Sequence, residues 1–222
     1  MSVLQNHSVI RVLIVDDHAL VRNGLTALVE SQADMDISGE ADSAAQALAV
    51  LEQAPAHVAV VDLSLKVGNG IQLIKDLKHR HPEIRIVVSS MHEETTYAER
   101  ALQAGAMAYI HKREDSHRIL DAIRSVMSGR IFVSEQISNR LLTKAARGPQ
   151  AAEQTSVELL TDRELQVFEL IGQGFATRTI AEQLHLSPKT VDTHRQKIRE
   201  KLNLENAAAL SHFATQWAMK DQ

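Results

Sequence analysis

The chain of 222 residues contains no cysteine, only four prolines and an aromatic content of 3%. Without cysteine it can form neither a disulfide framework nor a zinc–thiolate site, which fits a reducing compartment. With so few aromatic rings, the core must be built mainly from Val, Ile, Leu and Ala, within an apolar content of 44%. No apolar run approaches the ~20 residues that cross a bilayer, and residues 1–9 lack the basic start and apolar stretch of a signal peptide. We therefore expect a cytoplasmic protein with no membrane partner.

The chain also lacks an excess of basic residues, because 24 Lys and Arg against 28 Asp and Glu give a formal net charge of −4. A uniformly basic surface is thereby excluded, and any contact with nucleic acid must come from a local patch. The length allows one large domain or two small ones.

Residues 9–129 alternate between short β-branched apolar runs and helical patterns, which predicts five strands and five helices. Strict alternation of this kind is typical of a doubly wound parallel sheet with helices on both faces, an α/β fold. The clearest strand runs are Ile10–Val15, Val58–Val61, Ile84–Val88 and Met107–Ile110, and the helical patterns lie near residues 20–29, 44–51, 71–77, 97–104 and 119–126.

The pattern changes after residue 130. Ser134 is a candidate N-cap for a short helix to about Ala146, and the polar stretch 148–156 reads as a linker, so residues 130–156 are expected to connect two domains. Residues 157–222 show only helical patterns, which predicts a small all-α domain of four helices. Thr161 with Glu164 forms a capping-box pattern, and Ser187 followed by proline predicts another helix start.

Polar residues follow four of the predicted strands, at the point where each strand ends. They are Asp16 and Asp17, Asp62, Ser90 and Lys112. Ligand sites of parallel sheets form outside the carboxyl ends of the strands, so these side chains should converge. Three carboxylates suit Mg²⁺, and Asp62 is then the natural acceptor of a phosphoryl group that Lys112 neutralises. Ser89 competes with Ser90 as a hydrogen-bond donor.

Four segments resemble the receiver domains of NarL/FixJ-family two-component response regulators. They are VLIVDDHALVRNGL (12–25), VVDLSL (60–65), SMHEE (90–94) and AGAMAYIHK (104–112). The resemblance implies a flavodoxin/CheY-like receiver that is phosphorylated by a sensor histidine kinase. It further implies the following roles: Asp62 as phosphoacceptor, Asp16, Asp17, Asp62 and the Ser64 carbonyl as Mg²⁺ ligands, Ser90 and Tyr109 as a switch pair, and Lys112 as the phosphoryl contact.

Two positions depart from that family pattern. Lys66 stands where the family usually has proline, and Arg113 stands where an acidic residue is common. Neither change removes a ligand, but we expect both to affect the rates of phosphoryl gain and loss.

The segment Ser187–Lys201 has five basic and two acidic residues, a local net charge of +3. It follows a short helix and a tight His185-Leu186 connection, as in a helix-turn-helix. Within this helix Val191, Ile198 and Leu202 should be buried. Asp192, Thr193 and Gln196 face the opposite way, toward base edges, and Lys189, Arg195, Lys197 and Arg199 flank them and suit phosphates.

The segment LTDRELQVFELIGQGFATRTIAEQLHLSPKTVDTHRQKIREKLNL (160–204) resembles the LuxR-type helix-turn-helix, including its Thr190-Val191 block. The resemblance implies promoter DNA as partner and adds Thr190 to the expected contacts. In this family the last helix often forms the dimer contact. Here the apolar residues of 207–218 allow either that role or ordinary packing against the first helix of the domain.

These features predict a phosphorylation-controlled transcription regulator that dimerises when phosphorylated or on DNA. A phosphohydrolase would need a general acid where Ser64 stands, and no nucleotide-binding glycine motif is present, so we do not expect an enzyme. The alternative is a phosphorylation-independent regulator that uses the receiver only to dimerise. Such variants usually lose an acidic pocket residue, whereas this chain keeps all three.

Overall fold

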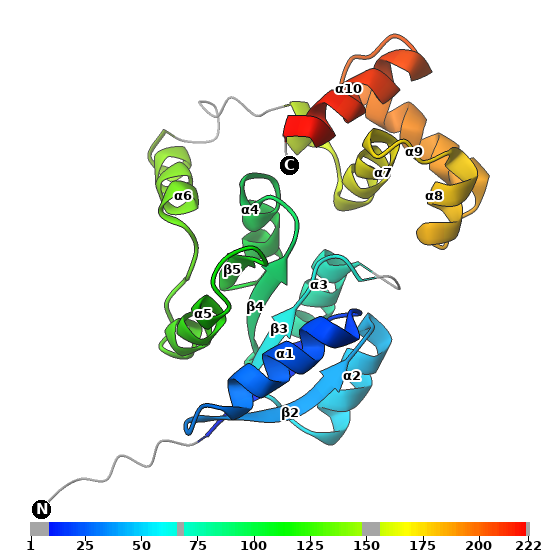
Figure 1. Cartoon of the computed structure of the whole chain (residues 1–222). Coiled ribbons are helices and arrows are strands. Elements are labelled where there is room, and N and C mark those ends of the chain that lie inside the picture. The colour runs from blue at the N-terminus through cyan, green and yellow to red at the C-terminus, as the bar shows by residue number, and fades with distance from the viewer. Residues whose placement is uncertain (1–8, 66–68, 148–155, 221–222) are drawn as a thin grey trace, which may run out of the picture. The chain divides into compact units, whose positions relative to one another are not determined.

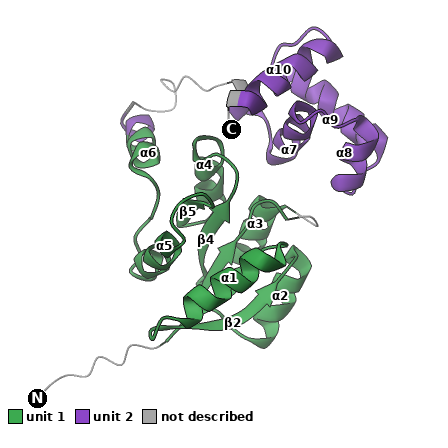
Figure 2. Cartoon of the chain, in the orientation of Figure 1, with its two compact units in different colours: residues 1–142 green, residues 143–222 purple. Residues whose placement is uncertain are grey.

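The computed structural model describes residues 9–65, 69–147 and 156–220. The chain forms two compact units, residues 1–142 and 143–222 (Figure 2). Among the described helices, none has the length and apolarity needed to cross a membrane.

The first unit is built on a five-stranded sheet whose paired strands are all parallel, with the order β2-β1-β3-β4-β5 (Figure 1). Because the strand order reverses at β1, the crevice at its carboxyl end is where such a sheet places a ligand. The doubly wound α/β prediction is confirmed. The strands are β1 (Ile10–Val15), β2 (Met35–Ala41), β3 (Val58–Val61), β4 (Arg85–Ser90) and β5 (Ala108–His111).

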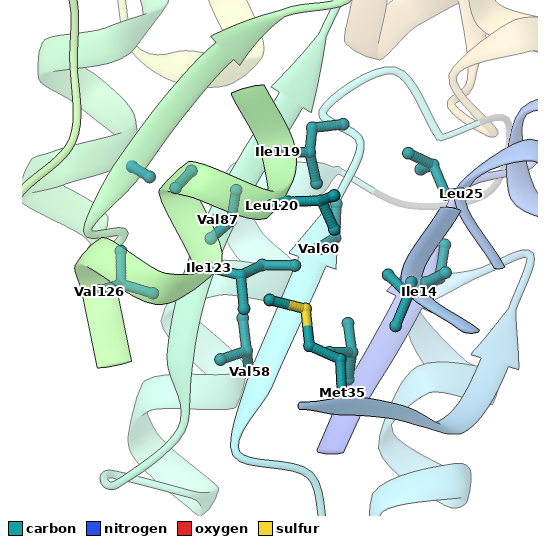
Figure 3. Packing of buried hydrophobic residues seen from close by; sticks show 14 of the residues in the cluster. Ile14, Leu25, Met35, Val58, Val60, Val87, Ile119, Leu120, Ile123 and Val126 are labelled. Carbon is teal, nitrogen blue, oxygen red and sulfur yellow. The ribbon is translucent and has the colours of Figure 1, made fainter. Parts of the chain in front are cut away.

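Five helices cover the two faces of the sheet, and they leave the central strand β3 buried on both sides. Along β3 the side chains alternate: Val58 and Val60 join the cluster under α1 and α5, together with Ile123 of α5 (Figure 3). The neighbouring Ala59 and Val61 are equally buried on the other face. The helices are α1 (Ala19–Glu30), α2 (Ala44–Gln53), α3 (Gly70–Arg80), α4 (Glu94–Ala104) and α5 (His117–Met127).

Gly70 lets α3 begin against the end of β3. A Cβ at this position would lie 2.4 Å from the Leu63 Cα and 2.6 Å from the Asp62 carbonyl oxygen, so any larger residue would displace the chain at the predicted phosphoacceptor. Asn69 caps the helix, because its side-chain oxygen accepts hydrogen bonds from the Ile71 and Gln72 amides. Lys66 lies outside the described residues.

The chain after α5 remains in contact with the sheet of the first unit. Phe132 forms an isolated parallel bridge with Ala108 at the open edge of β5. Ser134 then caps α6 (Glu135–Arg147) by accepting a hydrogen bond from the Ile137 amide at 3.2 Å, as expected. The first compact unit therefore reaches residue 142, inside the stretch predicted to be a linker. Most of the remaining predicted linker, residues 148–155, lies outside the described residues.

The second unit contains four α-helices among its described residues, as predicted, and a 3₁₀ helix at its start that was not predicted. The Thr161–Glu164 capping box and the Ser187 cap are both present. The tight turn before the third helix places His185 at a φ of 53°, a left-handed conformation uncommon outside glycine. The elements are η1 (Ser156–Leu159), α7 (Asp162–Gly172), α8 (Thr177–Gln183), α9 (Pro188–Lys201) and α10 (Ala207–Lys220).

The apolar side of α10 packs against α7. The Phe168 ring lies 5.9 Å from the Phe213 ring and 5.5 Å from the Trp217 ring, centroid to centroid. A Cβ at Gly172 would meet the Ala214 carbonyl oxygen at 2.6 Å, so glycine permits the close approach of the two helices. Packing within the unit thus accounts for the aromatic residues of the last helix.

Candidate phosphoacceptor site and nucleic-acid interface

Two carboxylates are buried side by side at the carboxyl end of the sheet. Asp16 follows β1 and Asp62 follows β3, and these strands are neighbours. The Asp62 amide donates to the Val15 carbonyl at 2.8 Å, which fixes the two strand ends together. Asp16 is 1% exposed and Asp62 2% exposed, so water does not screen their charges.

Lys112 bridges these two carboxylates. Its Nζ lies 2.6 Å from Asp16 Oδ2 and 2.7 Å from Asp62 Oδ2. Burial alone would lower the pKa of Lys112, but the charges of Asp62 and Asp16 outweigh it and raise that pKa. Burial raises the pKa of the Asp62 carboxyl, against the opposing attraction of Lys112 and a hydrogen bond from the Ser64 amide. The ammonium therefore stays charged and holds one oxygen of each carboxylate.

The same place gathers three carboxylates, whose oxygens are the ligands that a hard divalent cation takes. One ligand atom from each of Asp16, Asp17, Asp62 and the adjoining His18 lies within 4.8 Å of the others. Three carboxylates against one ammonium leave two negative charges, which a divalent ion neutralises. The Ser64 amide donates to Asp62 Oδ1 at 3.0 Å, which turns the chain after β3 along the edge of the pocket.

Ser90 and Tyr109 both form hydrogen bonds with the main chain of His92, and no hydrogen bond between the two side chains is among those described. The His92 amide donates to Ser90 Oγ at 3.1 Å, and the Tyr109 hydroxyl donates to the His92 carbonyl at 2.7 Å. The His92 ring stacks on Tyr97 of α4, with centroids 4.3 Å apart. Burial, with the nearby charges of Lys112 and His111, lowers the pKa of His92 to about 4. The two expected switch residues are thus joined by a third residue.

Sequence reasoning missed His92, His18 and Arg22 as parts of this site. His18 Nδ1 lies 2.7 Å from Asp17 Oδ1, and Arg22 donates to the Asp16 carbonyl at 2.7 Å. The position of His18 directly after the two aspartates was the available signal. No pattern pointed to His92, because its contacts come from distant segments. Ser89 is also buried and lines the pocket beside Asp62.

The predicted contact residues of α9 lie on its accessible side. Val191 and Ile198 are fully buried, and Leu202 is 9% exposed, which confirms the predicted buried face. Thr190 is half-buried and its hydroxyl bonds to the Ser187 cap, and Thr193 donates to the Lys189 carbonyl, so both hydroxyls already have partners within the helix. Lys189, Asp192, Thr193, Gln196 and Lys197 are exposed, and Thr190, Arg195 and Arg199 are half-buried.

Charged side chains of α7 hold α9 at both ends. Glu164 is 3% exposed, and its Oε2 lies 2.6 Å from Lys201 Nζ at the end of α9. Arg163 donates to the Leu184 carbonyl at 2.6 Å, at the turn before α9. Desolvation opposes the charged form of Glu164, but hydrogen bonds from Lys201 and Thr161 outweigh it and lower its pKa. The orientation of α9 within its domain is therefore fixed before any ligand binds.

Comparison with known proteins shows the family. The response regulator receiver domain family matches residues 12–124, and the LuxR family of bacterial regulatory proteins matches residues 158–214. The response regulator GacA of Pseudomonas viridiflava is 34% identical over 96% of this chain and 98% of GacA. UvrY of Escherichia coli K12 is 31% identical over 92% of this chain and 93% of UvrY.

A solved structure is similar over nearly the same span. RcsB of Salmonella enterica serovar Typhimurium, bound to promoter P1flhDC in the presence of the phosphomimetic BeF₃⁻, has a TM-score of 0.66 and 26% identity, covering 93% of this chain and 98% of RcsB. The chain belongs to the NarL/FixJ family of two-component response regulators, in which a receiver precedes a LuxR-type helix-turn-helix domain. It is a phosphorylation-controlled, DNA-binding transcription regulator. Its family is one of regulators and is not a known enzyme family.

Proposed function

We propose that Asp62 accepts the phosphoryl group from a sensor histidine kinase. An Asp62 carboxylate oxygen attacks the phosphorus of the kinase's phosphohistidine; the new O–P bond forms as the P–N bond breaks, and the departing imidazole nitrogen keeps the electron pair. The observation that carries this proposal is the buried contact of Lys112 with Asp16 and Asp62. It keeps a cation beside the acceptor, where a phosphoryl oxygen arrives.

We assign the metal position to Asp16, Asp17, Asp62 and the Ser64 carbonyl. The oxygen ligands and the two excess negative charges fit Mg²⁺, which favours hard oxygen donors. When bound, Mg²⁺ supplies positive charge that offsets the repulsion between the carboxylates and an incoming phosphoryl group.

The kinase needs a docking surface beside an acceptor that is nearly buried. A pocket of about 870 Å³ opens next to Asp62, between α1 and the start of α5, and its walls are largely apolar. We propose that a helix of the kinase rests here, because this placement brings its phosphohistidine to the open side of Asp62. The lining residues include Val21, Leu25, Leu28, Ile119 and Lys112.

The second unit is the proposed DNA reader. We assign residues 9–129 to the receiver, 130–156 to the linker with its short helix, and 157–222 to the DNA-binding domain. In α9, Lys189, Arg195, Lys197 and Arg199 bind phosphates, and Thr190, Asp192, Thr193 and Gln196 lie toward base edges. Phosphorylation favours a homodimer, which places two such helices on one promoter site.

The first experiment is the intact mass of the protein after incubation with Mg²⁺ and a small phosphoramidate donor. We expect one phosphoryl adduct on the wild type and on the control Asp36→Asn, which changes an exposed carboxylate of β2, and none on Asp62→Asn. An adduct that survives in Asp62→Asn would move the acceptor to another residue. No adduct on any protein, with kinase also present, would favour the phosphorylation-independent regulator that uses its receiver to dimerise.

A further inference from the structure

The segment Ile131–Arg140, here termed the strap, is bonded to the edge strand that carries Tyr109. The Phe132 amide donates to the Met107 carbonyl at 2.9 Å, and the Tyr109 amide donates to the Phe132 carbonyl at 3.0 Å. β5 is the last strand of the sheet, so the strap takes up hydrogen bonds that its open edge would otherwise offer to another chain.

The same strap is bonded to the first turn of α4. The Ser134 amide donates to Glu94 Oε1 at 3.0 Å, and Arg140 Nη1 donates to the Thr95 carbonyl at 2.9 Å. Ile137 lies between these two bonds and is 2% exposed. The first turns of α6 (Glu135–Arg147) are therefore docked on the receiver through the buried Ile137 and these two polar contacts.

Both attachment points adjoin the proposed switch pair. α4 begins two residues after His92, whose main chain binds Ser90 and Tyr109 and whose ring stacks on Tyr97 of α4. A shift of Ser90 toward a phosphoryl group on Asp62 pulls on the His92 amide. It thereby displaces the first turn of α4, where Glu94 and Thr95 hold the strap.

We propose that the docking of the strap on the receiver responds to phosphorylation. Phosphorylation of Asp62 loosens the contact of α6 with α4, and α6 passes this change to the chain that leads into the DNA-binding unit. This inference rests on the proposed function, because it needs a phosphoryl group at Asp62. It adds a residue-level route, through Glu94 and Arg140, by which the receiver controls that unit. Small shifts at a site become larger ones when they tip a docked element between two discrete positions.

The test is amide hydrogen exchange of the full-length protein, read by mass spectrometry, with and without Mg²⁺ and beryllofluoride. We expect beryllofluoride to raise the exchange rate of peptides covering residues 134–142 by about tenfold.

The variants Arg140→Ala and Glu94→Ala should each raise this exchange rate by a similar factor without beryllofluoride. A tenfold change corresponds to about 1.4 kcal/mol, the size expected for the loss of one hydrogen bond to a charged group. The exposed Arg130→Ala is the matched control and should leave the exchange rate unchanged. Phosphoryl uptake, measured by intact mass, should stay as in the wild type in all three variants.

Two outcomes separate this inference from the proposed function. If beryllofluoride changes exchange at residues 90–95 but not at 134–142, the strap is a fixed part of the receiver and the inference is wrong. If neither segment responds and no phosphoryl adduct forms, the pocket does not accept a phosphoryl group and the proposed function fails with it.

Discussion

His92 is the residue through which the phosphoacceptor pocket reaches α4. Its amide and carbonyl bind Ser90 and Tyr109, and its half-buried ring lies on Tyr97. An imidazolium there would sit near the charge of Lys112 in a medium that solvates it poorly. The neutral ring is therefore part of the native state, because its surroundings disfavour the protonated form.

The pKa of His92 predicts a specific loss of receiver stability in acid. The folded-state pKa of about 4 lies below the usual 6.5, so the unfolded chain binds the proton first as the pH falls. The free energy of unfolding is full above pH ~6.5 and declines through pH 4, by roughly 2 kcal/mol between pH 7 and pH 5. His92→Phe, which keeps a stacking ring, should remove that part of the decline.

The measurement is amide exchange in the buried strand β3, corrected for intrinsic rates, at pH 7 and pH 5. His117→Phe, at an exposed position on α5, is the control and should decline like the wild type. An equal decline in His92→Phe would show that other groups carry the acid sensitivity.

Residues whose role follows from a strand end could be predicted from the sequence. Asp16 and Asp62 come directly after an apolar run and Lys112 one residue after another, and parallel strands bring their carboxyl ends to one edge, as the distances of 2.6 and 2.7 Å confirm. His92 could not be predicted in this way. Its role depends on a hydrogen bond that its carbonyl accepts from Tyr109, 17 residues later, and on a ring contact that only the packed loop creates.

At the scale of elements, α9 combines a buried face with a charged accessible face. Its caps and its apolar spacing are local signals, so both faces were predictable.

The extent of β4 could not be predicted from the sequence, because Ser89 and Ser90 read as the polar end of a strand. The structure pairs them with Ile110 and His111 of β5, and the ladder outweighs their weak strand preference. The bridge of Phe132 to β5 is a single long-range contact and leaves no periodic trace.

The two kinds of contact on α9 should differ in their dependence on salt. Lys197→Ala should weaken binding to all DNA sequences and lower the slope of log affinity against log salt by about 1, because one phosphate contact is lost. Gln196→Ala should instead cost about 1–3 kcal/mol at one base position and leave the slope unchanged. Titration by fluorescence anisotropy over several salt concentrations measures both quantities.

Arg80→Ala, on the exposed end of α3 in the receiver, is the control for a lost positive charge. A loss in Lys197→Ala restricted to one base position would overturn its assignment to a phosphate. An unchanged sequence preference in Gln196→Ala would remove that residue from the reading face.

For the whole molecule, the chain divides control and readout between two compact units. One reading helix makes few contacts, so its affinity alone is modest. Joining two DNA-binding units through their receivers makes the second binding event intramolecular, and this can raise the overall affinity by 10²–10⁴ without any new contact. The proposed role of phosphorylation is therefore to change effective concentration, not the structure of α9.

This role predicts that the gain from phosphorylation depends on the geometry of the DNA. Two α9 helices related by a two-fold axis read half-sites about 10–10.5 bp apart. With beryllofluoride bound, the wild type should bind such a site far more tightly than Asp62→Asn does. Inserting about 5 bp between the half-sites should abolish most of the difference, because one half-site turns to the opposite side of the duplex. Inserting about 10 bp should restore part of it. The measurement is the affinity of both proteins for the three DNAs. If the wild type keeps its advantage in affinity after the half-turn insertion, phosphorylation frees single DNA-binding units and pairing is not required.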